Sequence, residues 1–338
     1  MRIKYIIAIV LLFIIGSLAA KAVCESPSSC TVYVNSEWTE EHYDFELIWD
    51  CTAFSTIARA IEVRGSDCGS SLVIITEGPV VITANDTIPG DLILNNSESS
   101  TITGTIFVQG NLIINNIISL TGDGNIEVQG NMTFGDEGGI LTLGGVGLKV
   151  DGYFYDFDED HYIDASGDGS VTITTHSIIT VPVGTNTGFY PVIITASSGQ
   201  VFAIRTDKEP DLPGNAGLTS GWDVSMLPSG NFDGDESVTI SFIYPRNSVT
   251  EYFDINNAII MHFNTQTHEW EALNASHTEV WSENSDYYIS TVEGMTDFSP
   301  FVIGLTGMIT ALPMWTKVGL IVIISLLGLF LLRKLKIF

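Results

Sequence analysis

A 20-residue repeat in the middle of the chain restricts the fold more than any other feature of the sequence. Glycine followed by Asp or Asn and then by β-forming residues recurs in 90–95, 110–115 and 130–135. A period near 20 with several short β runs per repeat is typical of a β-solenoid, in which each coil stacks its apolar side chains on the next. We expect the Gly and Asn positions at the corners, because these residues tolerate a left-handed backbone and Asn side chains can stack in ladders.

One helix is predicted before the repeat, over residues 53–63. Its apolar face consists of Phe54, Ile57, Ala58 and Ile61. Thr52 or Ser55 is the expected N-cap, since each has a side-chain oxygen just outside the apolar pattern.

The helix and the two apolar runs that follow it, 72–78 and 80–83, resemble the capping helix and first coil of the parallel β-helix superfamily of pectate-lyase-like surface proteins. The resemblance covers about residues 50–180. It implies an all-β fold built on a short right-handed parallel β-helix. It leaves the function open, because the superfamily includes adhesins, lyases and hydrolases.

A second β region follows the solenoid, and its strand spacing predicts a β-sandwich. Alternating runs occupy 191–195, 237–242, 258–263 and 287–292. The region is similar to a membrane-proximal module of secreted bacterial surface proteins, with matching residues Tyr190-Pro191-Val192, Trp270 and Phe298-Ser299-Pro300-Phe301. Three tryptophans are expected to pack its core rather than to stack on sugars: Trp222, Trp270 and Trp281.

The N-terminal residues have the pattern of a signal peptide. Arg2 and Lys4 precede an apolar stretch over 5–15, and Ala20 and Ala22 are small residues at the positions that a signal peptidase requires. We expect cleavage after Ala22 and export of the rest of the chain.

The C-terminal residues have the pattern of a membrane anchor or sorting signal. An apolar run over 318–332 is followed by basic residues, so a single span would leave the N-terminus outside the cell. The segment resembles the IPTL-CTERM and PEP-CTERM sorting signals of bacterial surface proteins, in which a processing protease is a partner. The residues that carry this pattern are Leu312, Pro313, Trp315, Gly319, Arg333 and Lys334. An ordinary single-pass tail anchor is the alternative.

These signals divide the chain into five segments. They are a signal peptide (1–22), a disulfide-stapled cap with a helix (23–70), a β-solenoid (71–180), a β-sandwich (181–306) and a sorting signal or transmembrane anchor (307–338). The predicted location is the cell surface or outer envelope, with release if the tail is cleaved.

Acidic side chains dominate the part between the two end signals. All 40 acidic residues lie there with only six basic ones, so its net charge is six minus 40, or −34. Such a surface repels nucleic acid and other anionic polymers and suits divalent cations or a saline environment. Solubility at a crowded cell surface explains the charge equally well.

The four cysteines lie in the predicted cap: Cys24, Cys30, Cys51 and Cys68. An even, clustered set in an exported protein predicts two disulfides. The spacing leaves all three pairings open.

The run 156–168 predicts a calcium site, because oxygen donors recur at alternate positions. The expected ligands are Asp156, Asp158, Asp160, the carbonyl of Tyr162, Asp164 and Asp168. The run departs from an EF-hand, since His161 replaces the tight-turn Gly and Gly167 replaces the bidentate Glu. An acidic, solvated connector between the two domains is the alternative.

The favoured function is non-catalytic: an adhesin-like or structural surface protein that binds an extracellular glycan or matrix. A β-helix glycoside hydrolase using two carboxylates of 156–168 is an alternative, as is a calcium-dependent carbohydrate-binding protein. A polyuronate lyase is disfavoured, because Lys149 is the only basic residue between Arg64 and Arg205. The motifs of serine hydrolases, zinc proteases and phosphate loops do not occur.

Overall fold

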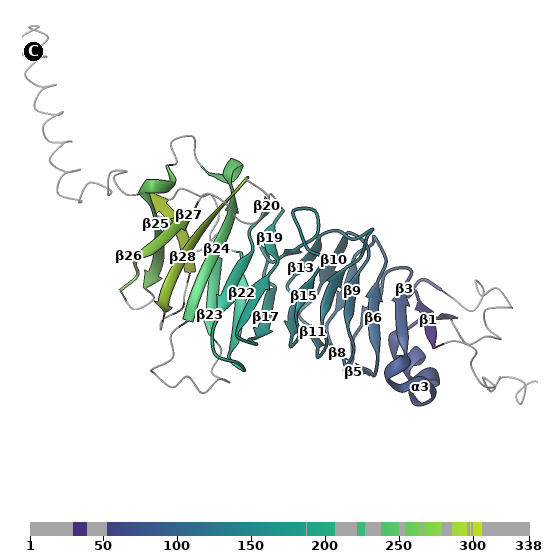
Figure 1. Ribbon diagram of the computed structural model, residues 1–338. Helices are drawn as coiled ribbons and strands as arrows, with labels where there is room; N and C mark the ends of the chain where they lie inside the picture. Colours follow the sequence, from purple (N-terminus) through teal and green to yellow (C-terminus); the bar gives the residue numbers. More distant parts are fainter. Residues whose placement is uncertain are drawn as a thin grey trace, which may run out of the picture. The chain divides into compact units, whose positions relative to one another are not determined.

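The structure is a computed structural model (Figure 1). It describes residues 30–38, 53–186, 188–206, 222–226, 238–249, 254–264, 267–278, 286–295, 298 and 300–305. These residues are mostly β-strand and include one α-helix. They belong to two compact units, Met1–Thr174 with Pro182–Asn186, and Thr175–Val181 with Thr187–Phe338.

The first unit is a parallel β-solenoid made of three sheets, as the repeat predicts. Sheet 1 contains, in spatial order, β2 (Ala53–Phe54), β1 (Thr31–Val34), β3 (Val73–Thr76), β6 (Asp91–Leu94), β9 (Leu112–Ile114), β12 (Met132–Phe134) and β15 (Phe154–Tyr155). Within this unit, sheet 2 contains β4 (Val81–Ile82), β7 (Ser100–Ile102), β10 (Ile118–Thr121), β13 (Leu141–Gly144), β16 (Ile163–Asp164) and β19 (Val183–Thr185). Sheet 3 contains β5 (Asp86–Ile88), β8 (Thr105–Val108), β11 (Asn125–Val128), β14 (Gly147–Val150) and β17 (Ser170–Thr174). From β3 to β17 the chain visits the three sheets in turn, one strand in each per coil (Figure 1).

The solenoid core consists of equivalent side chains stacked from coil to coil. Leu92, Leu112 and Met132 are in register on neighbouring parallel strands, and all three are fully buried. Successive side chains of a strand point to opposite faces, so one inward residue per strand position builds each apolar column. The 20-residue period is therefore the length of one coil.

One corner of the solenoid is an Asx ladder, which confirms the prediction from the repeat. The backbone N–H of Asn111 donates to Asp91 Oδ1 at 2.7 Å, and that of Asn131 donates to Asn111 Oδ1 at 2.9 Å. Asn131 Oδ1 in turn accepts from the backbone N–H of Tyr153 at 3.0 Å. Each Asx side chain thus accepts a hydrogen bond from a backbone N–H of the next coil. Sheet pairing alone would leave that N–H without a partner.

The glycines of this corner have a different role from the predicted one. Gly110 and Gly130 do not have the positive φ that the sequence interpretation assumed, whereas Gly122 and Gly145 have φ values of 110° and 111°. A Cβ atom on Gly110 would lie 2.6 Å from the carbonyl carbon and oxygen of Gly90. Close approach of consecutive coils, not left-handed backbone, excludes larger residues there.

The single described helix, α3 (Ile57–Cys68), begins four residues later than predicted and ends five residues later. Ala53 and Phe54 are strand residues instead, because they pair with Tyr33 and Val34 of β1. Thr56, not Thr52 or Ser55, is the N-cap, and its Oγ1 accepts from Arg59 N at 3.2 Å.

The second unit contains two antiparallel sheets. Sheet 4 contains β22 (Val201–Arg205), β23 (Trp222–Met226), β29 (Pro300–Leu305), β25 (Ala258–Asn264) and β26 (Glu269–Leu273). Sheet 5 contains β18 (Ile178–Val181), β21 (Val192–Thr195), β24 (Val238–Pro245), β28 (Tyr287–Met295) and β27 (Ala275–Thr278). The remaining described elements are β20 (Gly188–Phe189) and three short 3₁₀ helices, Gly69–Ser71, Arg246–Ser248 and Ile255–Asn257.

Aromatic side chains join the two sheets of this unit, as in a β-sandwich. Trp222 of sheet 4 lies 4.7 Å from Phe242 of sheet 5, and Phe242 lies 5.1 Å from Phe301 of sheet 4, between ring centroids. Trp222 is 1% exposed, and its Nε1 donates to the carbonyl of Tyr190 at 2.9 Å. The expectation that Trp222 packs the core is therefore confirmed.

The predicted signal peptide and the sorting residues Leu312, Pro313, Trp315, Gly319, Arg333 and Lys334 lie outside the described residues. Within the described part of the chain, no helix is long and apolar enough to span a membrane.

Candidate binding face

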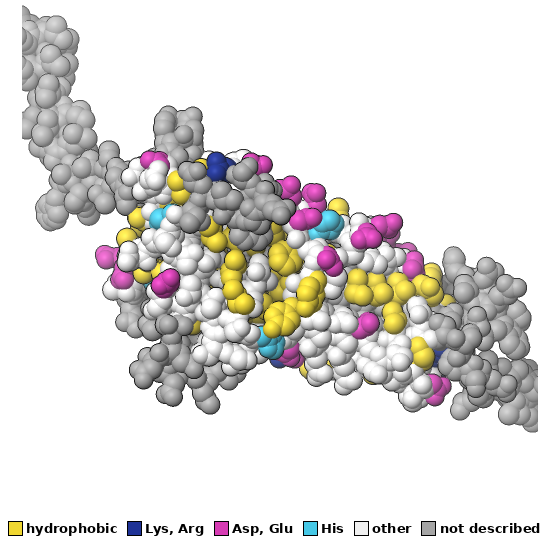
Figure 2. Space-filling view, viewed as in Figure 1, with side chains coloured by type: hydrophobic (Ala, Val, Ile, Leu, Met, Phe, Trp, Pro, Cys, Tyr) yellow, Lys and Arg dark blue, Asp and Glu magenta, His cyan; other side chains and the backbone are white. Residues whose placement is uncertain are grey.

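Sheet 1 of the solenoid carries a row of outward-facing apolar side chains. Because Ile74, Leu92 and Leu112 point into the core, their neighbours one position later must point outward. The outward residues are in register across six strands: Tyr33, Ile75, Ile93, Ile113, Thr133 and Tyr155. We call this row the sheet-1 column. Hydrophobic side chains gather in a row over β9, β6 and β3 in Figure 2.

The sheet-1 column is flat, long and uncharged. Neighbouring strands lie about 4.8 Å apart, so six strands extend over roughly 24 Å. Most of its side chains are half-buried against each other, and Tyr155 at the last strand is 47% exposed. The ring of Tyr153, which is 40% exposed, lies 6.4 Å from that of Tyr155. None of the six residues is ionisable at neutral pH, in a chain with 40 acidic residues.

The outward faces of the other two sheets have different chemistry. On sheet 2 the hydroxyls of Thr101 and Thr121 lie 3.3 Å apart, next to the exposed Val81. On sheet 3 the outward row contains both Glu127 and Lys149, which are cross-strand neighbours. The sheet-1 column is therefore the apolar face of the described solenoid.

Two of the predicted calcium ligands are engaged in the solenoid itself. The carbonyl of Tyr162, the expected backbone ligand, accepts from Leu141 N at 2.9 Å, and the Tyr162 hydroxyl donates to Thr185 O at 2.8 Å. Asp164 is 5% exposed, and its Oδ1 accepts from both the backbone N–H and the hydroxyl of Ser166, at 3.1 and 2.6 Å.

The structure places the other predicted ligands on exposed turns. Asp158 Oδ1 accepts from Asp160 N at 2.8 Å and lies 2.7 Å from His161 Nδ1. Asp156 has a φ of 57°, and Asp168 follows β16 in a separate bend. Among the described residues, no group of three or more His, Cys, Asp or Glu side chains converges on one point as a metal site requires.

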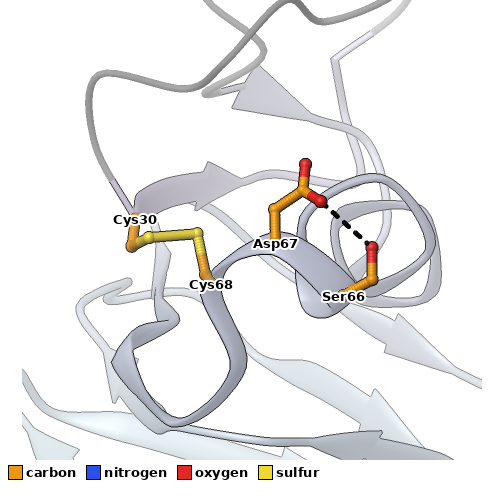
Figure 3. The surroundings of a disulfide bond; sticks show 4 residues. All are labelled: Cys30, Ser66, Asp67 and Cys68. Atoms are coloured by element: carbon orange, nitrogen blue, oxygen red, sulfur yellow. Dashed lines mark hydrogen bonds between the residues drawn. A yellow bond between two sulfur atoms is a disulfide. The ribbon is translucent and has the colours of Figure 1, made fainter.

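A disulfide joins Cys30, just before β1, to Cys68, the last residue of helix α3 (Figure 3). Their Cα atoms lie 5.6 Å apart, within the usual range for a disulfide. This bond selects one of the three pairings that the spacing left open. Cys24 and Cys51 lie outside the described residues.

A Ser–His pair in the second unit has nucleophile-like geometry, and no sequence motif predicts it. His277 Nδ1 lies 2.7 Å from Ser290 Oγ, and the Tyr244 hydroxyl lies 2.9 Å from the same oxygen. Burial lowers the pKa of His277 and raises the pKa of Tyr244. Ser290 is fully buried, so no substrate reaches its hydroxyl. The pair is a structural hydrogen-bond network rather than a catalytic one.

Comparison of the chain with protein-family models, with curated proteins and with solved structures gives no match.

Proposed function

We propose that this chain is a non-catalytic, adhesin-like protein displayed at the cell surface, and that its sheet-1 column binds an extended, neutral glycan of the surrounding matrix. The observation that carries the proposal is the uncharged row, apolar except at Thr133, that continues in register over six strands. Binding would be the sum of many weak contacts along the row, since each coil contributes one side chain of similar character.

The charge distribution favours a neutral partner. A net charge of −34 between the two end signals repels polyuronates and other anionic polymers at long range. The sheet-1 column has no charge with which to hold an ionic ligand. Sugar rings present apolar C–H faces, and exposed tyrosines such as Tyr153 and Tyr155 suit those faces.

Export and anchoring complete the proposal. Residues 1–22 would direct secretion, and residues 307–338 would hold the chain in the membrane or deliver it to a sorting protease. The Cys30–Cys68 disulfide supports an oxidising compartment. We also propose that the solenoid coils are right-handed, as parallel β connections generally are. We also propose that calcium is held by the exposed carboxylates of Asp156, Asp158 and Asp160, without Tyr162 and Asp164, which bond within the solenoid.

The test is retention of the purified full chain on insoluble neutral polysaccharides such as cellulose and chitin, with polygalacturonate gel as the anionic comparison. Ile93→Glu places a charge in the middle of the sheet-1 column. Phe107→Glu makes the same kind of change in the same coil, on the outward face of sheet 3, where Phe107 is 37% exposed. We expect Ile93→Glu to weaken retention roughly tenfold, as loss of a central contact does, and Phe107→Glu to leave it unchanged.

Two results would overturn the proposal. Equal retention of the two variants would show that the sheet-1 column is not the binding face. Release of reducing ends from any polysaccharide in the panel would make the chain an enzyme.

A further inference from the structure

One residue, Asn274, connects the edge strands that the two sheets of the second unit have among the described residues. Strand β26 is the edge of sheet 4, and strand β27 is the edge of sheet 5. Asn274 lies between the last residue of β26 and the first of β27, and its side chain is exposed. Unpaired strand edges promote pairing with other chains unless a charge, a bulge or a covering group blocks them.

Asn274 also begins the tripeptide Asn274-Ala275-Ser276, which is an N-glycosylation acceptor pattern. The Ser276 side chain, which the pattern requires, is exposed as well. Among the described residues, no group forms a hydrogen bond with the Asn274 amide. The acceptor nitrogen and the hydroxyl are thus both accessible.

The other three matches to the pattern within the described residues lie in the solenoid, each next to an adjacent coil. Asn131 is part of the Asx ladder, with its Oδ1 bonded to Tyr153 N. Asn85 Oδ1 accepts from Thr105 N at 3.0 Å. Asn95 is half-buried at a corner, where its backbone N–H donates to Thr76 Oγ1. A glycan on any of the three would have to fit against the adjacent coil.

We propose that Asn274 is a site of N-glycosylation. The donor would be a lipid-phosphate-linked oligosaccharide, used by a membrane oligosaccharyltransferase. Nδ2 of Asn274 forms a bond to the anomeric carbon of the first sugar, and the bond from that carbon to the lipid-phosphate oxygen breaks. Nδ2 loses one proton to a base of the transferase, and the lipid phosphate is the leaving group. The reaction involves no oxidation or reduction.

The position gives the modification a physical role. A glycan on Asn274 would extend over the ends of β26 and β27 and would hinder edge-to-edge pairing between copies of this protein. In the cell the modification rests on the export that the proposed function includes. Its chemistry does not depend on binding at the sheet-1 column, so the two proposals can fail separately.

The test uses the folded full chain, purified in detergent from a host without N-glycosylation. The chain is incubated with a single-subunit oligosaccharyltransferase that needs no acidic residue before the acceptor, and with its lipid-linked donor. Peptide mass spectrometry then measures the occupancy of each asparagine. We expect Asn274 to be modified roughly tenfold faster than Asn131, whose side chain must first leave a hydrogen bond. Asn274→Gln should remove the main product, and the matched variant Asn85→Gln should leave it unchanged.

A second measurement compares aggregation of glycosylated and bare chains by light scattering, and we expect the glycosylated chain to aggregate more slowly. Absence of sugar on Asn274, while a control peptide with the same tripeptide is modified, would overturn the proposal. Modification of Asn85, Asn95 or Asn131 in preference to Asn274 would also overturn it. Neither result depends on export or on glycan binding.

Discussion

The close contact between glycines of adjacent coils leads to a quantitative prediction for Gly110→Ala. The added Cβ would lie 2.6 Å from the carbonyl carbon and oxygen of Gly90, about 0.8 Å closer than the 3.4 Å at which ordinary contact begins. The Gly90 atoms are backbone atoms, so the coils themselves must separate, and Asp91 Oδ1, which lies closer still, must also move. Such a shift stretches the hydrogen bond from Gly110 N to Gly90 O from 2.9 Å to about 3.7 Å, beyond hydrogen-bonding distance.

The expected cost follows from the groups that lose contact. One lost backbone hydrogen bond costs about 1 kcal/mol, or more where the donor stays buried, and overpacking a tight site costs about 1–3 kcal/mol. We therefore expect Gly110→Ala to lower the free energy of unfolding by about 2–4 kcal/mol. For a unit of this size that corresponds to a fall in melting temperature of roughly 4–16 °C.

Gly65→Ala is the matched control, because it is the same substitution in helix α3. The new Cβ would meet only the Ile61 side chain, at 3.3 Å. Alanine in a helix is more favourable than glycine by about 0.5–1 kcal/mol, so we expect no loss of stability. Thermal unfolding followed by circular dichroism at 218 nm, a wavelength chosen for β-structure, measures both variants. A melting temperature for Gly110→Ala within about 1 °C of the unmodified chain would refute the argument that coil contact selects glycine.

Three further predictions concern other groups. Burial lowers the pKa of His277 below its unfolded value near 6.5. The contribution of neutral His277 to stability should therefore be complete above about pH 6.5 and be lost as the pH falls below that value. His277→Asn should remove this part of the pH dependence of urea unfolding. Loss of the Cys30–Cys68 bond, which closes a loop of 38 residues, should cost about 4 kcal/mol, measured with Cys30→Ser together with Cys68→Ser. Digestion at glutamate under non-reducing conditions places each cysteine in a separate peptide, and it should show Cys24 linked to Cys51 as the second predicted disulfide. Calcium should raise the melting temperature of the unmodified chain but not of Asp158→Ala, and an identical response of the two would remove the calcium site.

The sequence predicted the solenoid well because the signal is local and repeated. Every coil has the same length between Gly90 and Gly130, so equivalent positions stack without any knowledge of distant contacts. The Asx ladder was predictable for the same reason. The role of the corner glycines was not predictable, because the sequence does not distinguish a glycine with positive φ from one that lies against the backbone of another coil. The φ angle of the folded chain separates the two, because it is positive at Gly122 and not at Gly110.

Non-local pairing explains the error at the start of helix α3. Phe54 fits the apolar face of a helix, but it also fits the end of sheet 1, where it pairs with Val34. Twenty residues separate these two partners, and local spacing contains no information about such a pairing. Thr56 can cap the helix only because the strand ends before it.

The same limitation applies to the acidic run. Counting donors along 156–168 treats the segment as one free loop. In the structure the segment includes β16, so the Tyr162 carbonyl and the Asp164 carboxylate hydrogen-bond within the solenoid. The sequence does not indicate a strand inside this run, because acidic residues surround its few apolar ones, Phe157, Tyr162, Ile163 and Ala165.

The sheet-1 column, in contrast, follows from a pattern that was visible but not used. Runs such as Leu92-Ile93-Leu94 and Leu112-Ile113-Ile114 are apolar at every position, which normally indicates a strand buried on both faces. A solenoid has only one interior, so every second residue of such a strand must face outward. An apolar residue at that position adds nothing to the core, and repetition of the choice at Ile75, Ile93 and Ile113 requires a reason outside the core. The pairing of equivalent strands in successive coils keeps these outward side chains in register, as it does the side chains of the core. A partner that binds the column therefore meets equivalent groups at each strand, so its affinity should increase with the number of coils that it contacts.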